Sequence, residues 1–261
     1  MLQRLKSTVI GPLVDTLYPP RCLACGEMTE GERGLCAACW RDTHFISGEA
    51  CVKCGLPLVG EASGLMDDAA AVIDGADVCD PCRRHPPGWN AGAAAVLYGG
   101  AARRVVLAFK HGDRLDMRDT LAEWMLPAGG RLLARADLIA PVPLHWRRLL
   151  RRRYNQSAEL ARALARRAER PVAVDLLTRR RFTTPQEGMD REARARNQAG
   201  AFAVAPRHRP RIEGRSILLI DDVLTSGATL SACAGALREG GAARVDVLVL
   251  ARVAFAEFGS I

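Results

Sequence analysis

Two patterns in this sequence place reactive side chains at spacings that recur in functional sites. The first consists of cysteines: eight of the nine form Cys-x-x-Cys pairs before residue 83. The pairs are Cys22/Cys25, Cys36/Cys39, Cys51/Cys54 and Cys79/Cys82. One such pair directs two thiolates at one ion, and two pairs complete a tetrahedral zinc site. Because four thiolates leave no open position on the metal, the pattern predicts structural zinc, one or two ions.

The spacing favours two zinc ribbons built from consecutive pairs, the first two pairs forming one ribbon and the last two the other. Interleaved pairing stays open. Gly26 and Gly55 directly follow the second cysteine of their pairs, where a zinc knuckle often needs a positive φ. Disulfides would need an oxidising compartment, and the spacings do not match the usual iron–sulfur runs. Cys233 stands alone and is expected to be a small buried residue.

The second pattern is ILLIDDVLTSGATL, residues 217–230. An apolar strand is predicted to present Asp221 and Asp222 at its carboxyl end, where they can accept hydrogen bonds from vicinal hydroxyls. The turn that follows runs from Thr225 to Thr229 and opens a helix. Its small residues let backbone N–H groups converge, and the helix N-terminus adds partial positive charge. The pattern therefore predicts a monophosphate cradle, and it differs from a Walker A loop because Gly-Lys-Ser/Thr is missing.

The elements that must position these residues alternate between strand and helix from about residue 89. Apolar runs predict strands over 93–98, 137–144, 216–222 and 244–253. Helical spacing and turn residues predict helices beginning at 102, over 157–169 and over 228–241. This alternation predicts an α/β domain with a parallel sheet covered on both faces, in which ligands bind beyond the carboxyl ends of the strands.

The chain is predicted to have three parts. Residues 1–20 form an amphipathic helix ended by two prolines, 21–87 a double zinc ribbon, and 88–261 the parallel-sheet domain. A length of 261 residues with 49% hydrophobic and 25% charged content fits a small module plus one α/β domain. No apolar run approaches the roughly 20 residues of a membrane span, and the start lacks a signal-peptide pattern. A cytoplasmic protein is expected.

The net charge of +8 is unevenly distributed. Between residues 147 and 211 there are 18 arginines and six acids, a net charge of +12, while the rest of the chain carries −4. Such a basic stretch suggests a polyanionic ligand, either phosphates or nucleic acid. A GC-rich genome explains why the chain has only three lysines. It does not explain why the excess charge gathers in one quarter of the sequence.

Residues 217–230 resemble the phosphoribosyl pyrophosphate (PRPP) motif of type I phosphoribosyltransferases. With the cysteine pairs before it, nearly the whole chain resembles the ComF family of competence-associated proteins, which includes GntX-like members. Further family-like segments are FKHGD at 109–113 and PVPLHWRRLLRRRYNQS at 141–157. A third comprises Thr183, Gln186, Arg194, Asn197, Ala201 and Phe202. The family's usual Arg-Gly-Phe-Asn-Gln reads RRYNQ at 152–156 here, so that Arg153 replaces the glycine.

The resemblance implies binding of PRPP with Mg²⁺. Asp221 and Asp222 would be the catalytic pair at the ribose, and the stretch after them would hold the 5′-phosphate. That stretch comprises Val223, Leu224, Thr225, Ser226, Gly227, Ala228 and Thr229. The pyrophosphate would be bound by the positive side chains of Lys110, Arg147, Arg151 and Arg194. Asn155 and Gln156 are expected either to cap the following helix or to contact the ligand.

Two functions stay open on this basis. The first is a phosphoribosyltransferase, a glycosyltransferase that moves the phosphoribosyl group from PRPP or a related phosphosugar to an unidentified acceptor. The second is a non-catalytic accessory protein of DNA uptake and natural transformation, which contacts single-stranded DNA or a helicase-like competence protein. The basic segment offers only four aromatic side chains for base stacking: Trp146, Tyr154, Phe182 and Phe202.

Overall fold

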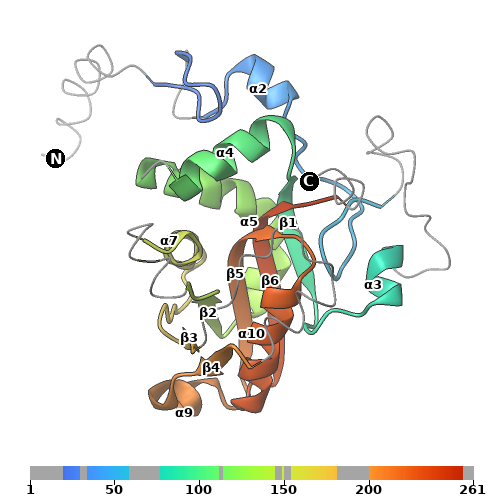
Figure 1. The fold of residues 1–261 in the computed structure, drawn as a ribbon, viewed down its shortest axis with the longest axis vertical. Helices are drawn as coiled ribbons and strands as arrows, with labels where there is room; N and C mark the ends of the chain where they lie inside the picture. The colour runs from blue at the N-terminus through green and yellow to red at the C-terminus, as the bar shows by residue number, and fades with distance from the viewer. Residues whose placement is uncertain are drawn as a thin grey trace, which may run out of the picture.

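The structure is a computed structural model that describes residues 20–29, 34–58, 77–111, 114–144, 149, 154–180 and 200–254 (Figure 1). The helix predicted over residues 1–20 lies outside these ranges except for its last residue. Arg147, Arg151 and Arg194 also lie outside the described residues.

A four-stranded parallel sheet lies at the centre, in the order β1-β6-β5-β2 (Figure 1). Its strands are β1 (Gly92–Leu97), β2 (Leu138–Pro141), β5 (Ser216–Leu224) and β6 (Arg244–Arg252). The two central strands are apolar and buried along most of their length, as expected for a sheet covered on both faces. The predicted parallel-sheet α/β fold is therefore confirmed.

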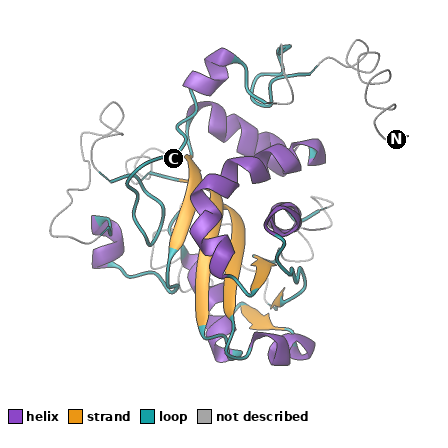
Figure 2. Cartoon of the chain, turned by 180° about the vertical axis from the view of Figure 1, so that it is seen from behind, coloured by secondary structure: helices purple, strands orange, loops and turns teal. Residues whose placement is uncertain are grey.

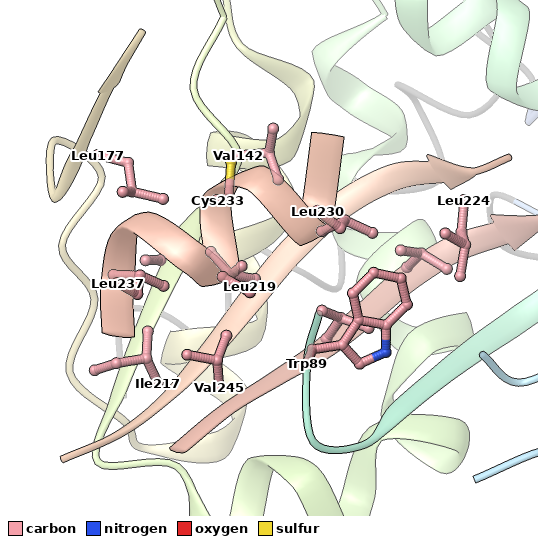
Figure 3. Packing of buried hydrophobic residues seen from close by; sticks show 14 of the residues in the cluster. Trp89, Val142, Leu177, Ile217, Leu219, Leu224, Leu230, Cys233, Leu237 and Val245 are labelled. Atoms are coloured by element: carbon pink, nitrogen blue, oxygen red, sulfur yellow. The ribbon is translucent and has the colours of Figure 1, made fainter. Parts of the chain in front are cut away.

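Alternate residues of β5 enter two different hydrophobic clusters. Leu218 and Ile220 pack with residues of α4 (Gly100–His111), α5 (Arg118–Arg135) and α7 (Gln156–Ala168). Figure 2 shows helices lying across this face of the sheet. Ile217 and Leu219 pack on the opposite face with α10 (Ala228–Glu239), as Figure 3 shows in close-up. Because side chains alternate along a strand, one strand supports both helical layers.

Shorter elements complete the described part of the chain. They are α2 (Ala37–Arg41), α3 (Asp80–Arg84), η1 (Leu115–Met117), β3 (Leu177–Arg179), β4 (Phe202–Val204), η2 (Pro206–His208) and α9 (Arg209–Ile212). The strands β3 and β4 form a separate antiparallel pair. None of the described helices has the length and apolar character needed to cross a membrane.

Segments outside the sheet cover both of its edge strands. Phe45 forms an antiparallel bridge with Val96 of β1, and the N–H of Ile46 donates to the carbonyl of Ala95 at 2.9 Å. At the other edge, Val172 forms a parallel bridge with Ile139 of β2. The polar backbone groups of the edge strands are thus partly occupied by the protein itself.

The strand that carries the acid pair is longer than the prediction. The sequence predicts a strand over 216–222, whereas β5 extends to Leu224, which pairs with Arg252 of β6. The extension arises because β6 also continues to this level and offers it a partner. Asp221 and Asp222 consequently lie in the last paired part of the strand, and the turn begins only at Thr225.

Two adjacent glycines in α5 provide a test of this packing. A Cβ on Gly129 would lie 2.4 Å from Cδ2 of the buried Leu248, whereas a Cβ on Gly130 would meet nothing within 4 Å. We expect Gly130→Ala to raise the free energy of unfolding by about 1 kcal/mol through helix propensity. Gly129→Ala should lower it by about 1 kcal/mol, because overpacking exceeds the same propensity gain. Urea denaturation of both variants measures the difference, and equal stabilities would contradict the packing.

Candidate functional site

The acid pair lies at the carboxyl end of β5 and is held by polar contacts from three elements. Oδ1 of Asp221 accepts a hydrogen bond from Oγ of Ser157 at 2.8 Å and one from the N–H of Asp222 at 3.0 Å. The carboxylate of Asp222 forms an ion pair with Nζ of Lys110 on α4 at 3.3 Å. Their side chains are only 13% and 19% exposed, so solvent screens this pair weakly.

The surroundings of the Asp221 carboxyl group favour its neutral form. Burial and the negative charge of Asp222 raise the pKa of Asp221 to about 7, even though the Ser157 hydroxyl and the Asp222 N–H bond its charged form. Lys110 opposes this rise, and it pairs directly with Asp222. Near neutral pH the site can therefore gain or lose a proton at Asp221 in response to a ligand.

The turn after β5 has the geometry of an anion cradle; we call residues 225–229 the phosphate loop. Gly227 has a φ of +80° and is the N-cap of α10, without a capping side chain. The first-turn N–H groups of α10 are therefore not bonded by a capping residue. Oγ of Ser226 is buried and has no hydrogen-bond partner among the described residues. A buried hydroxyl without a partner is costly, and a hydrogen-bonding group bound at the loop would satisfy it.

Arg252 at the end of β6 fixes the backbone of the phosphate loop from behind. It is 2% exposed, and its Nη1 donates to the carbonyl oxygens of Leu224 and Thr225, each at 3.0 Å. These bonds occupy the carbonyl side of the turn. Arg252 was not predicted as a site residue. The only signal for it in the sequence is its position at the end of a predicted strand.

The first turn of α7 joins the elements around the acid pair. Tyr154 Oη donates to the carbonyl of Phe109 at 2.5 Å, and Gln156 Nε2 donates to that of Lys110 at 3.1 Å. Asn155 is the N-cap: its side chain accepts from the N–H of Ser157, as the capping alternative predicts. The role of Ser157 was missed, and a hydroxyl beside a helix N-terminus was the only signal for it.

The remaining predicted ligand residues divide into three groups. Thr225 to Thr229 lie together in the loop and the start of α10, with Lys110 beside the acid pair. Val223 and Leu224 belong to β5, and the Leu224 side chain is buried in the core, which leaves its backbone for any ligand contact. Arg147, Arg151 and Arg194 are not among the described residues, so their predicted roles stay predictions.

The cysteines form two four-residue groups, and in each the Sγ atoms all lie within 4.8 Å of one another. The first cysteine cluster is Cys22, Cys25, Cys36 and Cys39, and the second is Cys51, Cys54, Cys79 and Cys82. Consecutive pairing is therefore confirmed. Gly26 and Gly55 have φ values of +78° and +73°, as predicted for zinc knuckles. Four thiols within this distance suit tetrahedral coordination, so both clusters are consistent with structural zinc.

The two clusters contact different parts of the protein. The first packs with Ala101 of α4, and Arg104 donates to Sγ of Cys39 at 3.7 Å. The second belongs to the main hydrophobic cluster together with sheet residues, and Cys54 and Cys82 line a cavity shared with Thr225 and Ser226. The ninth cysteine, Cys233, is fully buried in α10, as predicted.

Two known domain families match different parts of the chain. The double zinc ribbon domain matches residues 13–83, and the phosphoribosyl transferase domain matches residues 155–256. The solved glutamine PRPP amidotransferase from B. subtilis superposes on 54% of this chain with a TM-score of 0.34 and 20% identity. Only 30% of that longer chain is covered.

Two curated relatives match along most of their length. The DNA utilization protein YhgH of Salmonella typhi is 30% identical over 226 residues, which cover 84% of this chain and 90% of that protein. Competence protein F of Haemophilus influenzae is 28% identical over 238 residues, covering 89% of this chain and 96% of that protein. In this chain the double zinc ribbon domain precedes the phosphoribosyl transferase domain. Together with the similarity to these relatives, this shows that the chain belongs to the ComF family, in which a double zinc ribbon precedes a phosphoribosyltransferase-like domain.

Proposed function

We propose that the protein binds PRPP with Mg²⁺ at the end of β5 and transfers its phosphoribosyl group to an acceptor. The observation that carries the proposal is the phosphate loop, where a buried and unbonded Ser226 hydroxyl lies beside the N-terminus of α10. Immediately before it, Asp221 and Asp222 offer two carboxyl groups to a polyhydroxylated group joined to the phosphate. A phosphorylated ribose has both features.

Each group of residues would have a separate role in the reaction. The loop N–H groups would hold the 5′-phosphate, and the acid pair would accept hydrogen bonds from the ribose hydroxyls. The bond from C1 to the diphosphate oxygen breaks, a bond from C1 to an acceptor nitrogen forms, and the acceptor loses a proton. Because positive charge develops on the ribose, fixed carboxylates stabilise the transition state. Mg²⁺ would neutralise the departing diphosphate, and adjacent carboxylates are donors that this ion accepts.

A second candidate function is a non-catalytic role in DNA uptake, which the names of the two relatives favour. The described arginines of the basic segment give this candidate less support, because several are already neutralised. Arg166 and Arg167 on α7 both pair with Asp119 on α5. DNA binding that falls steeply with salt and survives loss of the acid pair would indicate a separate nucleic-acid site.

Calorimetric titration with PRPP and Mg²⁺ tests the proposed function directly. We expect wild type to bind and the double variant Asp221→Asn/Asp222→Asn to lose at least about tenfold in affinity, because charged hydrogen bonds to the ribose are removed. Glu123→Gln on the exposed surface of α5 is the control for loss of a carboxylate and should bind as wild type does. Failure of correctly folded wild type to bind would contradict the proposal.

Binding should also depend on pH, because the carboxylate form of Asp221 accepts the ribose hydroxyls. With a pKa of about 7, ionisation should raise PRPP affinity between pH 6 and 8, by up to about tenfold per unit below the midpoint. Ser157→Ala removes a hydrogen bond to the carboxylate and should move the midpoint to higher pH. Comparing both proteins at each pH cancels the ligand's own ionisation. Coincident profiles would show that Asp221 does not control binding.

The same group predicts how the stability of the unliganded protein changes with pH. The pKa of Asp221 lies above the ordinary aspartate value of 3.8, so the folded protein retains a proton that the unfolded chain releases. This contribution is complete below pH 4 and is lost as pH rises towards 7. Asp221→Asn should remove it, which urea denaturation at pH 5 and pH 7 measures. An unchanged difference in the variant would assign the effect to another group.

We further propose that both cysteine clusters hold zinc, so each chain should contain two ions by elemental analysis. Cys25→Ser should reduce the content to about one, because three thiolates bind zinc less tightly than four. Cys233→Ala should keep two ions, because Cys233 belongs to neither cluster. A single ion in wild type would contradict the assignment of one of the clusters.

A further inference from the structure

We infer that Trp89 is a positioning residue through which the second cysteine cluster holds the phosphate loop in its binding conformation. The inference rests on the proposed function and goes beyond it, because it gives a zinc ribbon a part in ligand binding. Trp89 lies between the cysteine-rich module and β1, and it is 4% exposed. It therefore belongs to the core and is not part of a free linker.

The Trp89 side chain contacts the ribbon and the loop at opposite ends. Its Nε1 donates to the carbonyl oxygen of Lys53, which lies between Cys51 and Cys54, at 2.6 Å. Its ring reaches Gly227, where an added Cβ would lie 2.7 Å from the ring atom Cη2. Figure 3 shows the ring on the same side of the sheet as Leu224 and Leu230. The indole thus fills the space directly behind the glycine of the loop.

The backbone around Trp89 is fixed on the α/β domain, so the ring has little freedom to move away. The N–H of Gly88 donates to Oγ of Ser231 at 3.2 Å. Asn90 Oδ1 accepts from Arg238 Nη2 on α10 and from the N–H of Val245 on β6, each at 3.0 Å. Bonds on both sides of Trp89 therefore tie this segment to the helix that the phosphate loop begins.

Little free space separates the second cluster from the loop. A cavity of about 20 Å³, large enough for one water, lies between them. Its lining includes Cys54, Cys82, Thr225, Ser226 and Arg252. The four thiolates of a zinc-loaded cluster carry more negative charge than the ion offsets, and the buried Arg252 guanidinium on the same cavity has the opposite charge. Loss of the metal would disturb both the packing and the charge behind the loop.

The first cysteine cluster offers a natural contrast within the same chain. It packs on α4 through Ala101 and Arg104, and the described residues show it no contact with the phosphate loop. We therefore expect the second cluster alone to be coupled to ligand binding. Because coupling of affinities is reciprocal, PRPP binding should in turn raise the affinity of one of the two cysteine clusters for zinc.

Hydrogen exchange of the unliganded protein tests the positioning role without any ligand. Trp89→Phe removes the indole N–H and shortens the ring, so amides of residues 224–230 should exchange at least about fivefold faster than in wild type. Trp124→Phe is the matched control, because Trp124 packs edge-on against Phe45 in the other hydrophobic cluster. Its loop should exchange as in wild type. Equal loop exchange in Trp89→Phe and wild type would overturn the inference.

Binding and zinc release provide the second measurement. Trp89→Phe should bind PRPP with Mg²⁺ at least about fivefold more weakly than wild type, while Trp124→Phe should bind equally well. In wild type, saturating PRPP should raise the chelator concentration needed for release of one zinc ion at equilibrium and leave that for the other unchanged. If Trp89→Phe does not fold, the zinc-release measurement on wild type tests the inference by itself. Unchanged release of both ions would then overturn the inference. If wild type binds no PRPP, the proposed function fails, while loop exchange still tests Trp89.

Discussion

The buried Arg252 guanidinium is the interaction on which the phosphate loop depends. A charge that is 2% exposed is costly unless hydrogen bonds surround it, and Nη1 alone reaches three carbonyl oxygens at the ends of β5 and β6. These bonds hold the last residues of β5 in place and begin the turn. The left-handed Gly227 then reverses the chain into α10. The loop is shaped by the sheet behind it before any ligand arrives, which lowers the entropy lost on binding.

The negative charges of the acid pair before the loop are also partly offset by the protein itself. Two adjacent carboxylates repel each other when both are ionised. Lys110 offsets one of them, and the raised pKa of Asp221 leaves the other partly protonated near neutral pH. The site can thus stay nearly neutral when empty and ionise when hydroxyl groups arrive to bond the carboxylate. Ser157 and the α7 first turn set this balance, since they hold both Asp221 and the backbone of Lys110.

The features that could be predicted from the sequence are the local ones. Cysteine spacing predicts the two clusters, and the small residues after Asp222 predict the turn that Gly227 makes. The contacts that shape the site join distant parts of the chain. Ser157 and Asp221 are 64 positions apart, and Trp89 and Gly227, which are in contact, are separated by even more residues. No local pattern reports such pairings, because they depend on how the sheet is assembled.

The net charge of the basic segment, residues 147–211, is a second property that the sequence alone predicts incompletely. Its composition alone suggests a surface for polyanions. In the structure, Arg167 bonds Asp119 and Glu123 on α5, and Arg166 also pairs with Asp119. These two acids lie outside the segment and neutralise part of its excess. Net charge over a stretch of sequence therefore overstates the field that a ligand would meet, because it does not include the partners that the fold supplies.

The backbone bridge between Phe45 and β1 has a consequence for the order in which the nascent chain folds. β1 is synthesised well before its sheet partner β6. Until then one side of β1 has no strand beside it, and an open strand edge invites pairing with other chains. The segment containing Phe45 precedes β1 and can cover its other side from the start. Only the side of β1 that later pairs with β6 would then stay open until β6 is made.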